Sequence, residues 1–325
     1  MTILGGVDIG GTKCALVVGR ATGDRVDVLG KRSYPTPESP EAAVRSFAKG
    51  LESLRGELGL TGFDAVGVSC GSPLDSRRGW ILSPPNLPHW DRVDAVAPLK
   101  AAFRSPVGLQ NDANACALAE WKWGAGRGCR NMIFLTFGTG MGAGLILDGK
   151  LYSGTSDMAG EVGHVRLEPD GPVGYGKAGS FEGFCSGGGI AAFARSVAEA
   201  SLREGRPTAF CSSLEQLPQI SARSVGEAAR AGDPAALDIY RVAGRKLGQA
   251  LALLVDILNP ERIVIGSIYG RQRELLEPYA LEVLEREALP GALRACEIVP
   301  AELGESVGDL ASLSVAMDAF MHTGG

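Results

Sequence analysis

The chain has 325 residues, of which 45% are hydrophobic and 21% are charged, and its net charge is −5. This composition is typical of soluble globular proteins, and the lack of a Lys/Arg block disfavours nucleic acid as a partner. No apolar run approaches the ~18 residues of a membrane span, and glycines come too early for a signal peptide. The seven cysteines include no C-x-x-C pair, as expected of free thiols in a reducing compartment. We therefore expect a cytoplasmic protein with no membrane partner, long enough for two domains.

The first 70 residues alternate between strand and helix signals. Three apolar runs predict strands: residues 3–7, 14–18 and 26–33. Ser39, Pro40 and Glu41 then follow in the order of an N-cap, an N1 proline and a first-turn acid, which predicts the start of a helix. Residues 65–69 predict a buried strand. Three strands, a helix and a strand are typical of an α/β fold.

A glycine loop joins the first two predicted strands, with the sequence Gly10-Gly11-Thr12-Lys13. Glycine lets the backbone approach a ligand closely, and successive N–H groups can then converge on a phosphate. Asp8 stands just before this loop. A carboxylate beside phosphate-binding glycines predicts a divalent cation, for which Mg²⁺ is the first choice.

Two polar positions in the next segment each allow two interpretations. Residues 75–95 are rich in proline, so Asn86 lies either in a plain surface loop or in a loop that contacts a polar ligand. A strand at residues 107–110 leads into Asn111-Asp112 and a helix. An aspartate at such a junction is usually an N-cap. Alternatively, Asp112 is a general base at the carboxyl end of a strand, where open α/β sheets bind ligands.

A second glycine loop, with Gly138, Thr139 and Gly140, follows an apolar run at residues 132–137. Its spacing also fits the dinucleotide fingerprint, but that motif opens a helix. Here Asp148-Gly149 predicts a hairpin instead. The two glycine loops lie about 130 residues apart, which indicates two similar halves that each present a backbone hairpin to one phosphate chain.

The rest of the chain is predicted to be mostly helical. Ser186 and three following glycines open a helix at residues 190–200, and Asp233-Pro234 opens a longer one. That helix becomes apolar at residues 250–258, with Asp256 as the exception, and this run predicts burial on all sides. The remaining predicted elements are a strand at 262–265, a helix at 271–288, a strand at 296–299 and a helix at 307–321.

Five motifs occur in order at plausible spacing: Asp8-Ile-Gly-Gly-Thr-Lys13, Asn86-Leu-x-x-Trp90, Asn111-Asp-Ala-Asn114, Gly138-Thr-Gly-x-Gly142 and Gly160-Glu-x-Gly-His164. Together they resemble the ROK family of repressors, open reading frames and kinases over essentially the whole chain. The resemblance implies an α/β fold of the actin-like, ribonuclease-H-like sugar kinase type, with a duplicated β-hairpin phosphate-loop half. It implies a smaller domain at residues 1–112 plus 306–325 and a larger one at 113–305. It also implies ATP, Mg²⁺, a hexose substrate and a homodimer.

The resemblance assigns roles by motif position. It makes Asp112 the catalytic base and Asp8 the Mg²⁺ ligand, through water. The residues implied to bind the sugar are Gly71, Ser72, Asn86, Asn111, Asp112, Glu161, His164 and Glu182. Those implied to bind ATP are Gly10, Gly11, Thr12, Lys13, Gly138, Thr139, Gly140, Gly266 and Ser267. Two positions depart from the family pattern. Ser267 replaces a glycine at the adenine site, and Gly71-Ser72-Pro73 replaces Pro-Gly-Pro near the sugar, which leaves the identity of the sugar open.

A third departure concerns zinc. The family often has C-x-C-G-x-x-G-C-x-E, whose three cysteines bind structural zinc together with the histidine. Here Val173, Tyr175 and Ser180 replace those cysteines, so we expect no zinc site, because His164 alone cannot complete a tetrahedral set. We expect burial of Val173, Tyr175 and Phe181 to hold this loop instead.

The sequence thus predicts ATP-dependent phosphorylation of a hexose, with the 6-hydroxyl of glucose as the first choice. Alternative substrates are mannose, fructose, allose, N-acetylglucosamine and N-acetylmannosamine. A non-catalytic sugar-binding ROK protein is a further alternative, although Asp8 and Asp112 would be unnecessary for binding alone. A sugar-responsive repressor would carry a helix-turn-helix domain before the Asp-x-Gly-Gly-Thr motif, where seven residues precede Asp8.

Overall fold

The computed structural model describes residues 1–322, which form two compact units. The first unit contains Met1–Phe134, Gly144–Gly160 and the chain from Glu302 onward, and the second contains Leu135–Ala143 and Glu161–Ala301. Strands and helices alternate along both, as an α/β fold requires. The division predicted at residues 112 and 306 stays a prediction.

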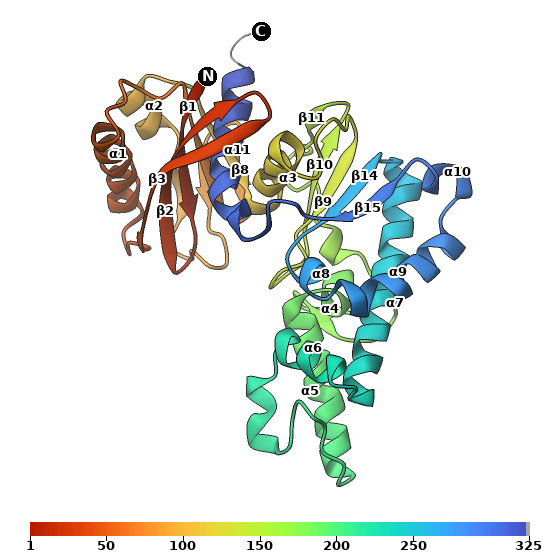
Figure 1. Ribbon diagram of the computed structural model, residues 1–325. Helices are drawn as coiled ribbons and strands as arrows, with labels where there is room; N and C mark the ends of the chain where they lie inside the picture. The colour runs from red at the N-terminus through yellow and green to blue at the C-terminus, as the bar shows by residue number, and fades with distance from the viewer. Residues whose placement is uncertain (323–325) are drawn as a thin grey trace. The chain divides into compact units, whose positions relative to one another are not determined.

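The first unit is built on a five-stranded sheet of order β3-β2-β1-β4-β8 (Figure 1). Its strands are β1 (Thr2–Ile9), β2 (Lys13–Thr22), β3 (Arg25–Pro35), β4 (Ala65–Cys70) and β8 (Val107–Asn111). β1 is antiparallel to β2 and parallel to β4, and β4 is parallel to β8. The carboxyl ends of β1, β4 and β8 therefore meet at one edge. All five strands predicted in this part of the chain are confirmed.

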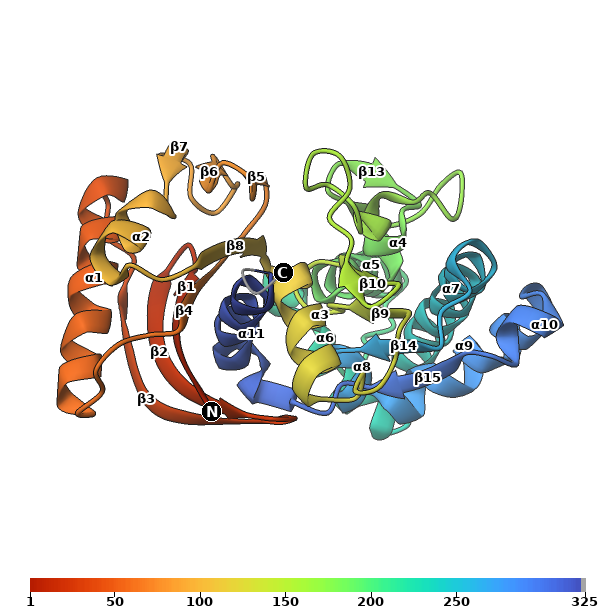
Figure 2. The ribbon, with the colours of Figure 1, turned by 90° about the horizontal axis from the view of Figure 1, so that it is seen from above.

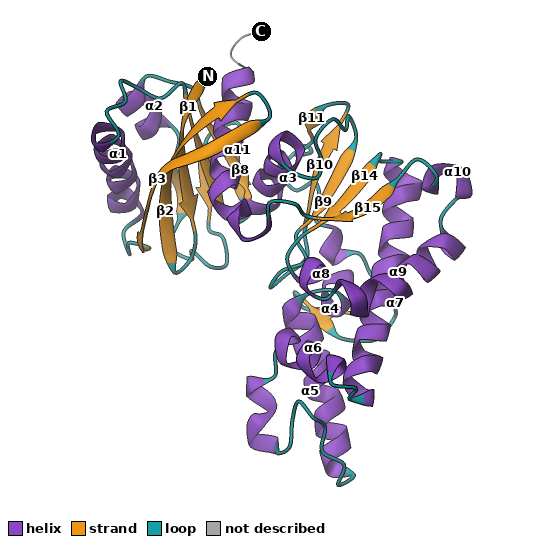
Figure 3. Cartoon of the chain, in the orientation of Figure 1, coloured by secondary structure: helices purple, strands orange, loops and turns teal. Residues whose placement is uncertain are grey.

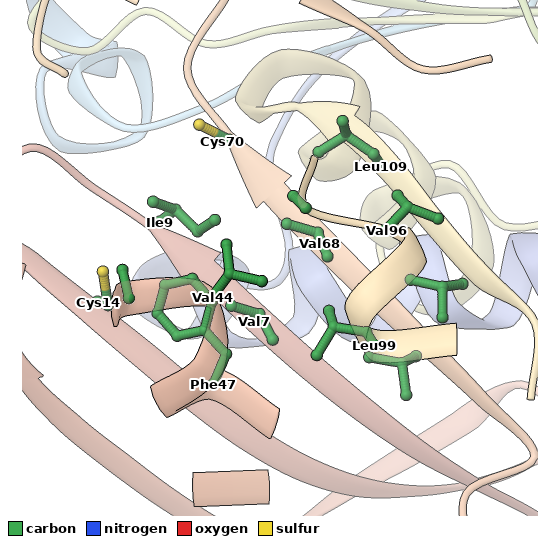
Figure 4. Packing of buried hydrophobic residues seen from close by; sticks show 14 of the residues in the cluster. Val7, Ile9, Cys14, Val44, Phe47, Val68, Cys70, Val96, Leu99 and Leu109 are labelled. Carbon is green, nitrogen blue, oxygen red and sulfur yellow. The ribbon is translucent and has the colours of Figure 1, made fainter. Parts of the chain in front are cut away.

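Helices cover both faces of this sheet (Figure 2). α1 (Pro40–Glu57) begins at the Ser39 N-cap, as predicted, and its buried stripe includes Phe47 and Leu51. Those side chains join α2 (Ala97–Phe103) and the strands in one core, part of which is drawn in Figure 4. The opposite face carries α3 (Asp112–Trp123) and α11 (Val307–Met321). A Cβ at Gly67 would lie 2.0 Å from the Ser312 carbonyl oxygen, so α11 packs closely because this strand position is glycine.

The proline-rich segment is more regular than predicted. Residues 75–95 overlap a three-stranded sheet of β5 (Leu74–Asp75), β6 (Trp80–Leu82) and β7 (Asp91–Asp94). These strands are two to four residues long, too short to leave a periodic signal. The turn between β6 and β7 carries Asn86.

A second five-stranded sheet has the order β11-β10-β9-β14-β15. Its strands are β9 (Met132–Leu135), β10 (Ala143–Leu147), β11 (Lys150–Leu151), β14 (Arg262–Ile265) and β15 (Glu297–Pro300). The predicted hairpin is confirmed, since Leu147 pairs with Lys150 across Asp148-Gly149, and both turn residues have positive φ.

Beyond this sheet the second unit is chiefly helical (Figure 3). Its helices are α4 (Phe181–Phe184), α5 (Gly187–Arg203), α6 (Ala222–Arg230), α7 (Pro234–Leu258), α8 (Ile268–Arg271), α9 (Arg273–Glu287) and α10 (Pro290–Leu293). The prediction that α7 is buried on all sides is wrong. Leu253 is 42% exposed and Ile257 73% exposed, because the helix packs α9 with one face. Within the described residues, no helix is both long and apolar enough to cross a membrane.

Candidate active site

Two acids lie at the carboxyl edge of the first sheet. Asp8 is paired with Ser69 of β4, and Ser69 with Gln110 of β8. Asp112 follows directly after β8, and its Oδ1 accepts a hydrogen bond from the Ser69 hydroxyl at 3.4 Å. Adjacent parallel strands thus bring Asp8 and Asp112 together from positions over 100 residues apart. This is the edge where open α/β sheets bind ligands.

The pKa values of both acids are raised. For Asp112 the cause is dehydration by the surrounding protein, partly offset by the Ser69 hydrogen bond, although the side chain remains open to solvent. Burial raises the pKa of Asp8 to about 7, and the negative charges of Asp112 and Asp309 add to this. A reactive carboxylate with a raised pKa is a stronger base near neutral pH. The electrostatics therefore suit Asp112 to proton abstraction.

The residues present fit a magnesium ion. Negative charge from two neighbouring acids disfavours ionised Asp8, and a divalent cation would offset that repulsion. Among the side chains that the structure describes, no group of three or more His, Cys, Asp or Glu could hold a metal. Mg²⁺ does not need such a cage, because it commonly binds one or two carboxylates together with substrate phosphates and water. Asp8 matches that kind of site.

The first glycine loop, residues 10–13, is held by its own backbone and by Thr36. Gly10 N–H donates to the Lys13 carbonyl at 3.1 Å. Thr36 donates its hydroxyl to the Gly10 carbonyl at 2.6 Å, and its N–H to the Thr12 carbonyl at 3.1 Å. Sequence reasoning missed Thr36, because the contact spans 26 residues and no motif includes it. Three hydrogen bonds therefore support the loop from within the first unit.

Asn86 is placed beside this loop. A Cβ at Gly11 would lie 2.6 Å from the Asn86 carbonyl oxygen, and one at Gly71 would lie 3.1 Å from the Asn86 side-chain oxygen. The structure thus brings together Gly11, Gly71 and Asn86, three of the predicted site residues. Ser72 follows Gly71 and precedes a cis peptide bond to Pro73. The Asn86 side chain is exposed, as a ligand contact requires.

The helix cap next to the catalytic candidate is Asn111. Its side-chain oxygen accepts from the Asn114 N–H at 2.8 Å, so it is the N-cap of α3. Asp112 is the first residue of the helix instead, and the alternative interpretation of Asp112 as the cap is wrong. The side-chain oxygen of Asn111 is bound to the helix, so only the amide N–H groups of that side chain can donate to a ligand.

The second glycine loop, residues 138–142, is held by the segment that follows Ser180. Glu182 Oε2 accepts from the Met141 N–H at 3.0 Å. The N–H groups of Gly187 and Gly188 donate to the carbonyls of Gly138 and Thr139 at 2.7 and 3.2 Å. Ser186 is the N-cap of α5, so the positive end of that helix lies against the loop. One oxygen of Glu182, a predicted sugar ligand, is thus bound to the loop.

Glu161 and His164 share a single helical turn. The His164 N–H donates to the Glu161 carbonyl at 3.1 Å, and η1 (Val162–His164) is a 3₁₀ turn. A Cβ at Gly163 would lie 2.2 Å from the Met141 carbonyl oxygen and 3.2 Å from the Glu182 Cβ. The structure therefore brings Glu161, His164 and Glu182 together beside the second glycine loop.

The second unit also has a cavity of about 720 Å³ next to this loop. Gly138, Thr139 and Ser267 line it, whereas Gly140 and Gly266 are not among its lining residues. The other residues that line the cavity were not predicted from the sequence: Gly187, Gly188, Ala191, Ile220, Ser221, Ala222, Arg223, Glu227, Arg230, Ile268, Arg271 and Gln272. The N-cap of α6 at Ser221 is the signal that could have indicated this helix start. The volume is in the range of small-molecule sites.

The loop that lacks the cysteines is held differently from what we predicted. Phe181 is buried, but Val173 is 56% exposed and Tyr175 71% exposed, so the prediction that all three are buried is wrong. The segment forms a hairpin of β12 (Val173–Gly174) and β13 (Lys177–Ala178), whose outer face is solvated. Ser180 is fully buried and caps α4, with its oxygen 3.1 Å from the Gly183 N–H.

These features define a class of protein. The first sheet carries two acids and a glycine loop at one edge, and the other unit carries a second glycine loop. The chain has the actin-like, ribonuclease-H-like fold of sugar kinases. The ROK family model matches residues 4–318, and the chain belongs to the ROK family. The predicted family and fold class are confirmed.

Three known proteins illustrate the similarity. A glucokinase of Streptomyces coelicolor is 32% identical over 316 residues, which cover 96% of this chain and 97% of that protein. The ROK hexokinase of Thermus thermophilus has a TM-score of 0.79 and 31% identity over 99% of this chain and all of its own. A Streptomyces griseus ROK glucokinase, solved with glucose and AMPPNP, has a TM-score of 0.73 and 30% identity over 97% of this chain and 99% of its own.

Proposed function

We propose that this protein is an ATP-dependent hexose kinase that phosphorylates the 6-hydroxyl of glucose, with Asp112 as the general base. The proposal rests on the sheet edge that carries Asp8, Ser69 and Asp112. There the Asp112 carboxylate, whose pKa is raised, is exposed to solvent beside a glycine loop of the kind that binds phosphate. Similarity to two glucokinases and a hexokinase supports the reaction class and favours glucose.

Asp112 has the chemistry for the proton transfer. Its carboxylate accepts the proton of the sugar hydroxyl, the oxygen bonds to the γ-phosphorus of ATP, and the bond from that phosphorus to the bridging oxygen breaks to release ADP. The transition state of this transfer is loose, so positioning and charge stabilisation supply most of the rate enhancement. The Ser69 hydroxyl donates a hydrogen bond to the Asp112 carboxylate at 3.4 Å and so favours one orientation of it.

The glycine loops position the phosphates. The first loop supplies Gly10, Gly11, Thr12 and Lys13, and the second supplies Gly138, Thr139 and Gly140. Asp8 would hold Mg²⁺, and the bound ion would supply positive charge that neutralises the phosphates. The cavity that Ser267 lines accepts the nucleoside. Ser267 itself has a positive φ. Sugar hydroxyls pair with Asn86, Asn111, Glu161, His164 and Glu182.

A sugar panel tests the proposal. Purified protein is assayed with ATP, Mg²⁺ and each of glucose, mannose, fructose, allose, N-acetylglucosamine and N-acetylmannosamine, and the product is located by NMR. We expect the highest kcat/KM with glucose and a 6-phosphate product. A higher kcat/KM for another sugar would reassign the substrate, and no phosphorylation of any sugar would contradict the kinase.

We further propose that the enzyme works without zinc, because Val173, Tyr175 and Ser180 supply no thiolate. Untagged protein should contain less than one zinc per chain and should keep its activity with Mg²⁺ after a zinc-selective chelator. Activity that disappears on chelation and returns with added zinc would contradict this prediction.

The enzyme is also proposed to be a cytoplasmic homodimer, as the family resemblance implies. Light scattering during size-exclusion chromatography tests this, and a mass near that of one 33.8 kDa chain would contradict it.

A further inference from the structure

The β12–β13 hairpin contacts His164 in two ways. The Lys177 ammonium group donates a hydrogen bond to the His164 backbone carbonyl at 2.7 Å. The Tyr175 ring meets the His164 imidazole edge-on, with 5.1 Å between ring centroids and an interplanar angle of 86°. The hairpin therefore contacts both the main chain and the ring of His164, a residue proposed to bind the sugar.

The hairpin itself is well anchored. Its two-residue turn, Tyr175-Gly176, has φ values of 43° and 77°, which fit a tight hairpin turn. A Cβ at Gly174 would lie 2.5 Å from the Gly183 N–H nitrogen, so β12 lies directly on α4. Arg166 donates to the Ala178 carbonyl at 2.8 Å on the other strand. Lys177 thus extends from a hairpin whose two strands both contact the surrounding chain.

The contact has consequences for the turn that carries the sugar residues. The His164 carbonyl lies at the end of a 3₁₀ turn of three residues, too short to hold its own shape firmly. A hydrogen bond from a charged donor is stronger than one from a neutral donor, and Lys177 is half-buried, which limits competition from water. Removing that donor would leave His164 free to rotate away from the orientation that Tyr175 contacts.

We propose that Lys177 is a positioning residue for sugar binding, which orients His164 through its backbone carbonyl, with Tyr175 orienting the imidazole. This inference rests on the proposed function, because it takes His164 to contact the sugar. In this arrangement two side chains of the β12–β13 hairpin, Lys177 and Tyr175, are sufficient to orient His164.

Lys177→Met tests the hydrogen bond while it keeps the length of the side chain. We expect the KM for the sugar to rise roughly tenfold, the size expected when a hydrogen bond to a charged group is lost. The KM for ATP and kcat should change less than about twofold. Lys177→Arg can still donate and should restore most of the sugar affinity. Tyr175→Ala should raise the sugar KM less, by about two- to fivefold, in line with a ring contact.

The chain offers a matched control in its other hairpin. Lys150 also follows a two-residue turn with two positive φ values, Asp148-Gly149, and it is exposed. Lys150→Met removes the same charge from the same hairpin position and should leave both KM values unchanged. Thermal unfolding of every variant separates a loss of fold from a loss of sugar affinity.

A double mutant asks whether Lys177 acts through His164. In His164→Ala, adding Lys177→Met should raise the sugar KM no further, because the ring that Lys177 positions is gone. Full additivity would overturn the inference, as would equal effects on both substrates or a Lys177→Arg variant as weak as Lys177→Met.

Calorimetric binding of glucose without ATP separates this inference from the proposed function. A wild type that binds glucose but phosphorylates no sugar would contradict the kinase while leaving the role of Lys177 testable by affinity. A Lys177→Met protein that folds and binds glucose as well as the active wild type would overturn only the inference. If Lys177→Met fails to fold, the Lys177→Arg and Tyr175→Ala variants decide it by the same sugar KM values.

Discussion

The two glycine loops share a sequence plan but are supported differently. Residues 10–13 turn between two antiparallel strands and are held by the Thr36 hydroxyl and backbone. Residues 138–142 are held by the amide groups that open α5 and by Glu182. The acids with raised pKa values, Asp8 and Asp112, accompany the first loop, whereas the carboxylate beside the second loop already binds a backbone N–H. On the proposed function, this difference predicts that the acids beside the first loop serve proton transfer, whereas Glu182 beside the second loop serves binding.

The largest expected effect tests that assignment directly. Asp112→Asn should lower kcat by about 10²- to 10⁴-fold, the usual range for loss of a general base. Glucose affinity should fall less, because asparagine can still hydrogen-bond. Glu182→Gln is the matched control in the second unit, and we expect its kcat to fall less than tenfold because glutamine can still accept from Met141. A comparable loss of kcat in both variants would contradict the division of roles.

The second prediction concerns pH and the metal-free protein. Asp8 has a pKa of about 7 in the folded state against an ordinary value of 3.8, so the folded protein binds this proton more tightly than the unfolded chain. Stability should therefore fall as pH rises from about 4 to about 7 and stay level above that, by up to about 4 kcal/mol in total. Urea unfolding in EDTA across this range measures the loss.

Replacing Asp8 should remove its share of that pH dependence. Asp8→Asn should make the curve between pH 4 and 7 shallower, with a remainder from Asp112, whose pKa is also raised, whereas Asp24→Asn, in the exposed turn between β2 and β3, should leave it unchanged. A wild-type slope retained in Asp8→Asn would show that other groups cause it.

A pair of alanine substitutions compares how tightly the two loops are packed. The new Cβ of Gly11→Ala would lie 2.6 Å from the Asn86 carbonyl oxygen, whereas that of Gly138→Ala would come no closer than 3.4 Å to the Thr136 carbonyl oxygen. We expect Gly11→Ala to lower the free energy of unfolding by about 1–3 kcal/mol through overpacking. Gly138→Ala should stay within about 0.5 kcal/mol. Denaturant melts measure both, and equal losses would mean that the loops are equally confined.

The smallest expected effect concerns the support of the first loop. Thr36→Val removes the hydrogen bond to the Gly10 carbonyl without changing the side-chain volume. It should cost about 1 kcal/mol of stability and raise the KM for ATP by about three- to tenfold, with less change in the sugar KM. Thr22→Val, at the exposed end of β2, is the control. An unchanged KM for ATP would indicate that the loop needs no support from Thr36.

Much of the secondary structure follows from local sequence. Ser39 and Asp233 cap the helices that they were predicted to cap, because capping needs only a side-chain oxygen and nearby N–H groups. The Asp148-Gly149 hairpin also follows from local conformational preference. The motifs indicated the family from local sequence as well, because each motif is a short run of neighbouring residues.

Exposure and long-range contacts depended on the tertiary structure. The exposure of Ile257 depends on which face of α7 packs α9, and that of Tyr175 on which side of the hairpin lies on α4. An apolar pattern does not contain that information, because it records composition and not the position of neighbours.

For the site, the sequence by itself determined the identities of Asp8, Asp112, Glu161 and His164 and the class of chemistry that they can perform. Only the tertiary structure decided that Asp8 and Asp112 share one sheet edge and that Lys177 donates to the His164 carbonyl. The physical reason is that sheet register and hairpin docking bring together groups 13 to over 100 residues apart, and the pKa values and hydrogen bonds depend on those separations in space.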